Sequence, residues 1–105
     1  MAKYYQLVMV NAHPGGDESF NNWLDNHHIP EVCEAGGMTA CHRFELPPEE
    51  AGNPKATKKY MHLYELETDD LNATKEKINA KRHLRTPYPA GLDTSDMFAV
   101  WYKAR

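Results

Sequence analysis

Residues 20–31 bring together the side chains of this chain that are best suited to proton transfer. Within this run a carboxylate, Asp25, precedes two adjacent imidazoles, His27 and His28, and an indole, Trp23, lies just before it. An imidazole exchanges protons near neutral pH with little tuning of its pKa, so a positioned histidine can act as a general acid or base. We therefore take His28 as the first candidate for that role, with a structural histidine as the alternative.

The spacing in this run predicts a helix whose inner face carries Phe20, Trp23, Leu24 and His27. These positions follow the i, i+3, i+4, i+7 pattern of one helix face, and His28 falls on its flank. Pro30 lacks a backbone N–H, which predicts that regular helix stops or kinks near His28. We therefore expect both imidazoles at a helix C-terminus, where the macrodipole favours the protonated form. His27 is a candidate substrate contact.

Two further histidines lie on predicted strands at residues 38–46 and 60–67. In the alternating pattern of these strands, His42 and His62 each fall in phase with apolar or aromatic residues. A hairpin-like connection makes the two strands neighbours, so we expect both imidazoles to project into one cavity. Core histidines without a chemical role are the alternative.

Phenol and indole side chains complete the candidate site. A phenol can donate a hydrogen bond to an oxyanion that develops on a carbonyl compound, and Tyr64 is the strongest candidate for this role. Core packing with a satisfied hydroxyl is the alternative for each tyrosine. The candidate substrate contacts are Tyr5, Trp23, His27, Tyr60 and Tyr88. Arg43 and Arg82 could hold a carboxylate, with surface exposure as the default.

A metal site is the alternative use of these histidines. His28, His42 and His62, with an open fourth position, would suit a zinc, iron or copper ion. However, the sequence contains no short ligand motif such as HxH or HExxH. We therefore predict no metal and no cofactor, and keep a three-histidine metal site or haem as the alternative.

Composition limits the class of protein. The chain has 105 residues, 41% of them hydrophobic and 26% charged, with a formal net charge of −3, which predicts a single domain over residues 1–105. It lacks the basic excess that binding to a phosphate backbone requires, which excludes nucleic acid as a partner. No apolar run is long enough to cross a bilayer, so we predict no membrane contact and a cytoplasmic location. Cys33 and Cys41 form no CxxC pair and are expected to be free thiols.

Strand and helix patterns follow one another in the order β-α-β-β-α-β. We predict strands at about 4–11, 38–46, 60–67 and 97–102, and helices at about 18–28 and 71–84. The economical packing of this order is an α+β, ferredoxin-like fold, with a four-stranded antiparallel sheet and both helices on one face. The first and last strands are apolar in both phases, so we expect the other face to meet the sheet of a second subunit in a homodimer.

The motifs resemble those of EthD-like proteins, which belong to the superfamily of dimeric α/β barrels. The resemblance is carried by Phe20, Asn21, Trp23, Asp25, His28, Ile29, Pro30 and Glu31, by the glycine-initiated strand that follows, and by residues 60–67. It spans most of the chain and implies a pocket between the sheet and the helices, with His28 in it and Asp25 and Trp23 around it. The superfamily includes cofactor-free polyketide cyclases, dehydratases, decarboxylases and lactone isomerases, and also quinol-forming and haem-degrading oxygenases. A histidine at position 27, where these proteins often carry an acid, is a departure from the pattern.

These observations support three hypotheses of function. The first is a homodimeric, cofactor-independent lyase, dehydratase, cyclase or isomerase that acts on a small aromatic or polyketide-like carbonyl compound. In it, His28 moves the proton, Asp25 orients that histidine, and His42, His62 and Tyr64 bind the substrate or stabilise the oxyanion. The second is an oxygenase of the same fold that uses haem, a metal or the substrate itself. The third is a non-catalytic accessory protein that binds a small ligand.

Overall fold

The computed structural model describes residues 1–105, and its elements follow the predicted order. The strands are β1 (Ala2–Ala12), β2 (Ala40–Glu45), β3 (Tyr60–Thr68) and β4 (Leu92–Lys103). The first helical segment consists of α1 (Asp17–Trp23), the π-helical turn η1 (Leu24–His28) and α2 (Ile29–Gly36). The second consists of α3 (Leu71–Ala80) and the 3₁₀ turn η3 (Arg82–Leu84), and a further 3₁₀ turn, η2 (Pro48–Glu50), lies between β2 and β3.

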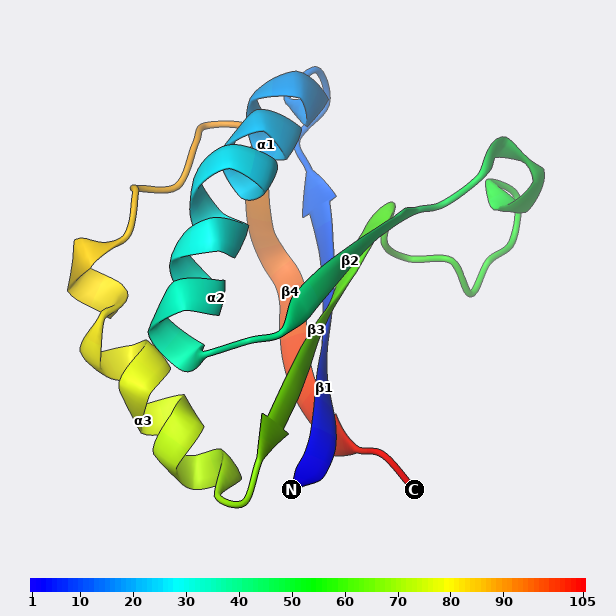
Figure 1. Ribbon diagram of the computed structural model, residues 1–105. Helices are drawn as coiled ribbons and strands as arrows, with labels where there is room; N and C mark the ends of the chain where they lie inside the picture. Colours follow the sequence, from blue (N-terminus) through cyan, green and yellow to red (C-terminus); the bar gives the residue numbers. More distant parts are fainter.

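The four strands form one antiparallel sheet in the order β2-β3-β1-β4. Both helical segments cover the same face of this sheet, and the connection between β2 and β3 extends away from the body of the molecule (Figure 1). This is the α+β, ferredoxin-like arrangement that the element order predicts. No helix in the chain has both the length and the apolar character that a bilayer crossing needs.

Strand β3 alternates as its sequence predicts. Tyr60, His62, Tyr64 and Leu66 are all buried, whereas the residues between them are partly or fully exposed. On the neighbouring strand β1, Val8 pairs with His62 and Gln6 with Tyr64. Directly paired residues project from the same face of a sheet, so the helix-covered face of β1 and β3 carries these side chains.

Regular helix, predicted to stop or kink near His28, is interrupted there by the π turn η1 and then continues as α2 to Gly36. The N–H of Ile29 donates to the carbonyl oxygen of Leu24, five residues earlier, which defines a π turn. In an α-helix the ring of Pro30 would clash with the carbonyl four residues before it, and a π turn is one of the recognised ways to relieve such a conflict. The helix ends at Gly36, because Gly37 has a φ of 69° that closes it.

Two glycines bring the start of β4 against the start of α1. The N–H of His13 donates to the carbonyl oxygen of Gly91 at 2.8 Å. A Cβ atom on Gly16 or on Gly91 would overlap the backbone of the other glycine. This close approach fixes the segment that precedes β4, residues 85–91, above the first helix.

The core is small and lies between α1, η1 and the sheet. Its main cluster consists of Val10, Phe20, Trp23, Leu24, Tyr60 and Leu92. Only 13 of the 105 residues are buried, so a single chain leaves much of its apolar surface in contact with water.

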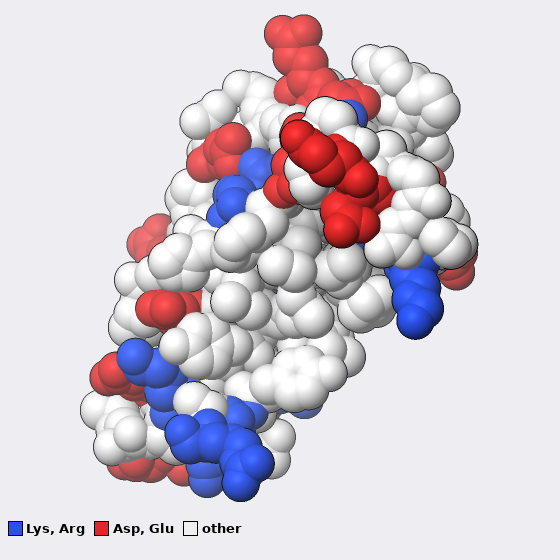
Figure 2. All heavy atoms as spheres, turned by 90° about the vertical axis from the view of Figure 1, so that its right-hand side faces the viewer, with Lys and Arg blue, Asp and Glu red and all other residues white.

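Most of that uncovered apolar surface lies on the sheet face opposite the helices, which we call the open face. The strand registers place on it Tyr5, Leu7, Met9, Phe44, Met61, Leu63, Phe98, Val100 and Tyr102. Phe44 is 46% exposed and Tyr102 is 61% exposed. Figure 2 shows this side of the molecule, with uncharged atoms across its centre, the largest acidic group toward the top, the largest basic group at the lower end, and smaller groups of both signs along the edges.

Candidate active site

A cavity of about 400 Å³ lies between the helices and the sheet, within the range of about 300–1,000 Å³ that is typical of small-molecule sites. The floor comes from β1, β3 and β4, and the walls come from the first helical segment, α3 and the connection that precedes β4. Helix α3 packs mainly against α2 and not against the strands. Space therefore remains between α3 and the sheet. The predicted pocket between helices and sheet is therefore present.

His28 lines this cavity from the π turn. Its ring stacks on the indole of Trp23, with centroids 4.5 Å apart and planes inclined by 25°. Its Nδ1 atom is buried and has no hydrogen-bond partner within the protein. Burial, together with the charge of Arg85 and against the opposing charge of Glu31, lowers the pKa of His28 to about 4. The imidazole is therefore neutral at pH 7, which leaves it able to accept a proton.

His62 and Tyr64 line the cavity from β3. Their rings meet edge to face at a centroid distance of 5.3 Å, and their exposed fractions are 3% and 1%. Nδ1 of His62 and the hydroxyl of Tyr64 both lack a hydrogen-bond partner within the protein. Burial lowers the pKa of His62 to about 3 and raises the pKa of the Tyr64 phenol well above its usual value. A neutral imidazole and a protonated phenol therefore face the cavity.

Three basic side chains reach the cavity from the second helical segment and the residue that follows it. Lys75, Arg82 and Arg85 all line it, whereas no aspartate or glutamate does. The guanidinium of Arg85 donates from Nη2 to the carbonyl oxygen of Ile78 at 3.3 Å, while its Nε atom is buried without a partner. None of the three forms an ion pair with an acidic group of the chain.

Aromatic rings form one wall of the cavity. Trp23 meets Tyr88 edge to face at 5.5 Å, and Nε1 of Trp23 donates to the carbonyl oxygen of Thr86. Thr86 is held in turn by Glu31, whose carboxylate accepts from the N–H of Thr86 at 2.8 Å and from its hydroxyl at 2.6 Å. Trp23 and Tyr88 thus lie at the cavity as the sequence predicts, and Glu31 fixes the segment that carries Tyr88.

The predicted convergence of His42 with His62 is wrong. In the register of β2 with β3, Arg43 pairs with His62, whereas His42 pairs with Leu63 on the open face. His42 is exposed there, with Nε2 at 3.3 Å from a carboxylate oxygen of Glu65. Hydrophobic alternation could not decide between the two phases of β2, because both faces of this sheet are apolar.

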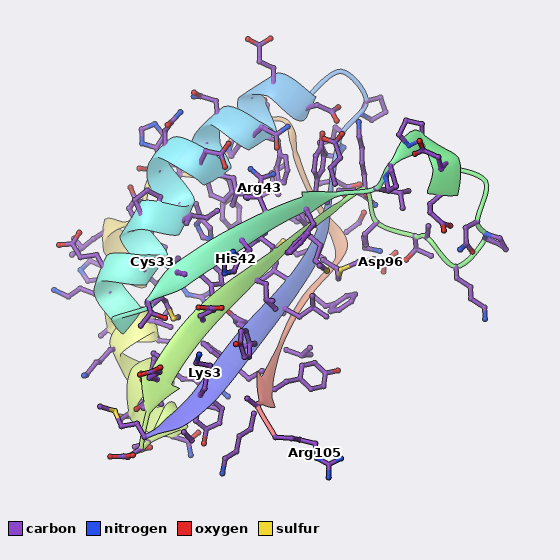
Figure 3. All side chains as sticks on the ribbon, turned by 45° about the vertical axis from the view of Figure 1, so that its right-hand side comes forward. Lys3, Cys33, His42, Arg43, Asp96 and Arg105 are labelled. Carbon is purple, nitrogen blue, oxygen red and sulfur yellow. The ribbon has the colours of Figure 1, made fainter.

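The predicted pairing of Asp25 with His28 is also not found. Asp25 accepts from Nη1 of Arg43 at 2.5 Å, and Arg43 also donates from Nη2 to Asn21 at 2.6 Å. Figure 3 shows Arg43 on β2 next to His42, on the side of the strand that faces the helices. The guanidinium lies 5.9 Å from the ring centroids of both Phe20 and Tyr60. Asp25 therefore joins the first helix to β2 and does not orient the histidine.

Three predicted substrate contacts lie outside the cavity. His27 is exposed on the outer side of the helix, because the π turn places His28, stacked on Trp23, on the inner side. Tyr5 pairs with Glu65 and Tyr102, which places it on the open face. Tyr60 is buried on the predicted face, but its hydroxyl donates to Asp17 at 2.6 Å and serves the core.

Several cavity residues carry no signal in the sequence. Arg85 stands alone before a turn rich in proline, and Lys75 belongs to a helix of weak amphipathic pattern. Arg82, considered above as a carboxylate ligand, does reach the cavity. Lys75, Arg82 and Arg85 are spaced by seven and three residues, which places helical residues on one side. Only the packing of the second helical segment against α2 turns that side toward the cavity.

The three histidines proposed as an alternative metal site do not converge. His28 and His62 line the cavity, but His42 projects from the opposite face of the sheet. No group of three histidine, cysteine or carboxylate side chains in the structure is arranged to hold a metal ion. Cys33 and Cys41 are free and half-buried.

Comparison with known proteins establishes the fold and nothing about activity. No family model matches the sequence, and no curated protein matches it. A solved structure with a similar fold is the crystal structure of NE2512, a protein of unknown function from Nitrosomonas europaea. It is 14% identical to this chain, with a TM-score of 0.58, and the match covers 99% of this chain and 90% of that one. The class thus defined is a small α+β domain with a four-stranded antiparallel sheet.

Proposed function

We propose that this protein is an EthD-like, cofactor-independent enzyme that transfers protons on a small aromatic or polyketide-like carbonyl compound. The observation that carries the proposal is the set of buried polar atoms without partners. Four of the five such side-chain atoms in the chain belong to residues that line the cavity, namely His28, His62, Tyr64 and Arg85. Buried polar groups in proteins are nearly always paired, so a concentration of unpaired ones in one cavity fits a bound ligand.

The chemistry begins with a neutral base beside an oxyanion donor. His28 accepts a proton from the carbon next to the substrate carbonyl, and the electron pair of that C–H bond moves onto the carbonyl oxygen. The protonated phenol of Tyr64 donates a hydrogen bond to the resulting enolate, and His62 contributes a second polar contact. The aromatic wall formed by Trp23 and Tyr88 accommodates a planar substrate.

The same enolate is the intermediate of the dehydratase, isomerase and cyclase reactions. In a dehydratase, the hydroxyl of the neighbouring carbon takes up the proton from His28 and leaves as water. In an isomerase, the proton returns to a different carbon. Attack of the enolate on a second carbonyl of the substrate gives a cyclase. In each case, His28 carries the proton from the step that removes it to the step that returns it.

The proposal includes a homodimer formed through the open face. An apolar sheet face of this extent is unusual on a monomer and marks an interaction surface. A second copy is the occupant that its charges favour, because the largest acidic group lies toward one end of this side and the largest basic group at the other (Figure 2). A two-fold axis in the plane of the face and perpendicular to the line that joins the two ends would bring unlike ends together.

Hydrogen exchange tests the activity without knowledge of the natural substrate. A panel of aryl ketones, β-diketones and aryl keto acids is incubated with the protein in D₂O, and loss of the α-proton signal is followed by NMR. We expect exchange above the buffer rate with at least one compound, and a fall of about 10²-fold or more for His28→Gln. His42→Gln is the matched control, since His42 lies on the open face, and it should retain full exchange. Equal exchange by wild type and His28→Gln would refute the role of His28.

A ligand-binding protein without turnover is the second candidate, and one observation favours it. The pKa values of about 4 for His28 and about 3 for His62 suit hydrogen bonding by neutral rings better than proton transfer at pH 7. This candidate predicts that compounds of the panel raise the melting temperature without exchange of any proton.

A further inference from the structure

We infer that the cavity takes a substrate that carries a carboxylate, which Arg85 binds together with Arg82 and Lys75, while the reacting carbonyl lies against His62 and Tyr64. The orientation of the carbonyl rests on the proposed function. The binding of an anion does not, because it stands on the charge and geometry of the cavity alone.

The charge of the cavity is opposite to that of the chain. The sequence contains 15 acidic and 12 basic side chains, yet the 21 residues that line the cavity include three basic ones and no acidic one. Low-dielectric walls strengthen the field of such a cluster and raise the local concentration of anions. The cavity therefore selects for a negatively charged guest.

The three basic groups are available to a ligand. Arg85, Arg82 and Lys75 form no ion pair with the chain's own carboxylates. The nearby carboxylate of Glu31 is occupied by the N–H and the hydroxyl of Thr86. Arg82 has a single long contact, from Nη2 to Asn79 at 3.4 Å. A carboxylate could accept two parallel hydrogen bonds from the guanidinium of Arg85, whose Nε has no partner.

A bound carboxylate would also activate the proposed base. The charges of Arg85 and Arg82 are among the causes that lower the pKa of His28. An anion beside these guanidinium groups offsets their effect, so the proton affinity of His28 rises when the substrate is in place. A neutral analogue would leave the imidazole a poor base, which couples recognition of the carboxylate to the chemistry.

A pair of matched probes tests the inference. Binding of 4-hydroxybenzoate and of its methyl ester, which has the same ring without the charge, is measured by isothermal titration calorimetry at low and high salt. We expect the acid to bind at least about tenfold more tightly than the ester at low salt, because a hydrogen bond to a charged group is worth about that factor. Added salt should reduce this preference.

Two variants that remove the same charge locate the site. Arg85→Gln should bring the two affinities to within about twofold, whereas Lys81→Gln, which lies on the same segment outside the cavity, should keep the preference. Equal binding of acid and ester by wild type, or no binding of either, would overturn the inference. If Arg85→Gln does not fold, the salt dependence of the wild-type preference for the acid still tests the inference.

The readouts separate this inference from the proposed function. Preference for the acid without α-proton exchange on any keto acid would retain the anion site and remove the enzyme. Exchange that is equally fast for a keto acid and its ester would retain the enzyme and remove the anion site.

Discussion

The indole of Trp23 stacks on the imidazole of His28, five residues later, with ring centroids 4.5 Å apart. In an α-helix, residues five apart point in directions that differ by about 140°, because each residue turns the helix by about 100°. The π turn at Leu24–His28 removes this difference, since it closes a hydrogen bond over five residues. The geometry of the candidate base thus depends on one irregular turn next to Pro30.

Loss of the indole should loosen the whole helix layer. We expect Trp23→Leu to lower the free energy of unfolding by about 2–3 kcal/mol, since it removes the stack on His28 and the hydrogen bond to Thr86. Urea denaturation followed by circular dichroism measures the loss. Tyr102→Leu, on the open face, is the comparison and is measured in dilute, monomeric protein. If it lowered the free energy of unfolding as much as Trp23→Leu does, the packing of Trp23 described here would be contradicted.

The two cavity histidines should make stability depend on pH. Their folded pKa values, about 4 for His28 and about 3 for His62, lie below the unfolded value of 6.5. As the pH falls below 6.5, the unfolded chain binds protons at these positions before the folded protein does. The free energy of unfolding therefore decreases, by up to about 1.4 kcal/mol per pH unit for each histidine.

Denaturation midpoints between pH 7 and pH 5 test this slope, and imidazole ¹⁵N shifts test its cause. The lowered pKa values of the carboxyls of Asp17, Glu31 and Asp93 add to the loss only in the lower pH range where carboxyls titrate. His62→Gln should flatten the curve between pH 7 and pH 5. Imidazole shifts showing that both rings are protonated at pH 6 would be incompatible with their burial.

Arg43 should matter for stability and not for proton transfer. Arg43→Lys keeps the charge but loses the fork that bonds Asp25 and Asn21, so we expect a loss of about 1–2 kcal/mol in the free energy of unfolding. Asp25→Asn should cost about 1 kcal/mol or less, because this carboxylate is half exposed. Both variants should retain α-proton exchange in the assay described above. A loss of exchange in Asp25→Asn with an intact fold would restore the orienting role that the sequence suggested.

A charge on the open face should prevent dimer formation. Val100 is 38% exposed in the single chain and lies opposite Leu7 in the sheet register. Val100→Asp would bury an unpaired carboxylate in the proposed interface, at a cost of several kcal/mol. Size-exclusion chromatography with light scattering should show a dimer for wild type and a monomer for this variant. Ala80→Asp, on α3 away from the open face, is the control, and a wild-type monomer at high concentration would rule out the proposed dimer.

The sequence by itself determined the order of the elements, the buried alternation of β3 and the placement of Trp23 in the core. These features follow from local spacing, which the chain carries wherever it folds. His62, Tyr64 and Trp23 were therefore predicted on inward faces, Tyr88 was proposed for its phenol alone, and the structure places all four at the cavity.

Only the tertiary structure decided which of the remaining groups meet. Pro30 predicted that the helix stops or kinks near His28, but the structure continues it through a π turn, which exposes His27 and turns His28 inward. The apolar character of both sheet faces left the phase of β2 open, and pairing with β3 assigned Arg43 to the helix side and His42 to the open face. Lys75, Arg82 and Arg85 share one side of the second helical segment through local spacing, but that side lines the cavity because α3 packs on α2, a contact between distant parts of the chain.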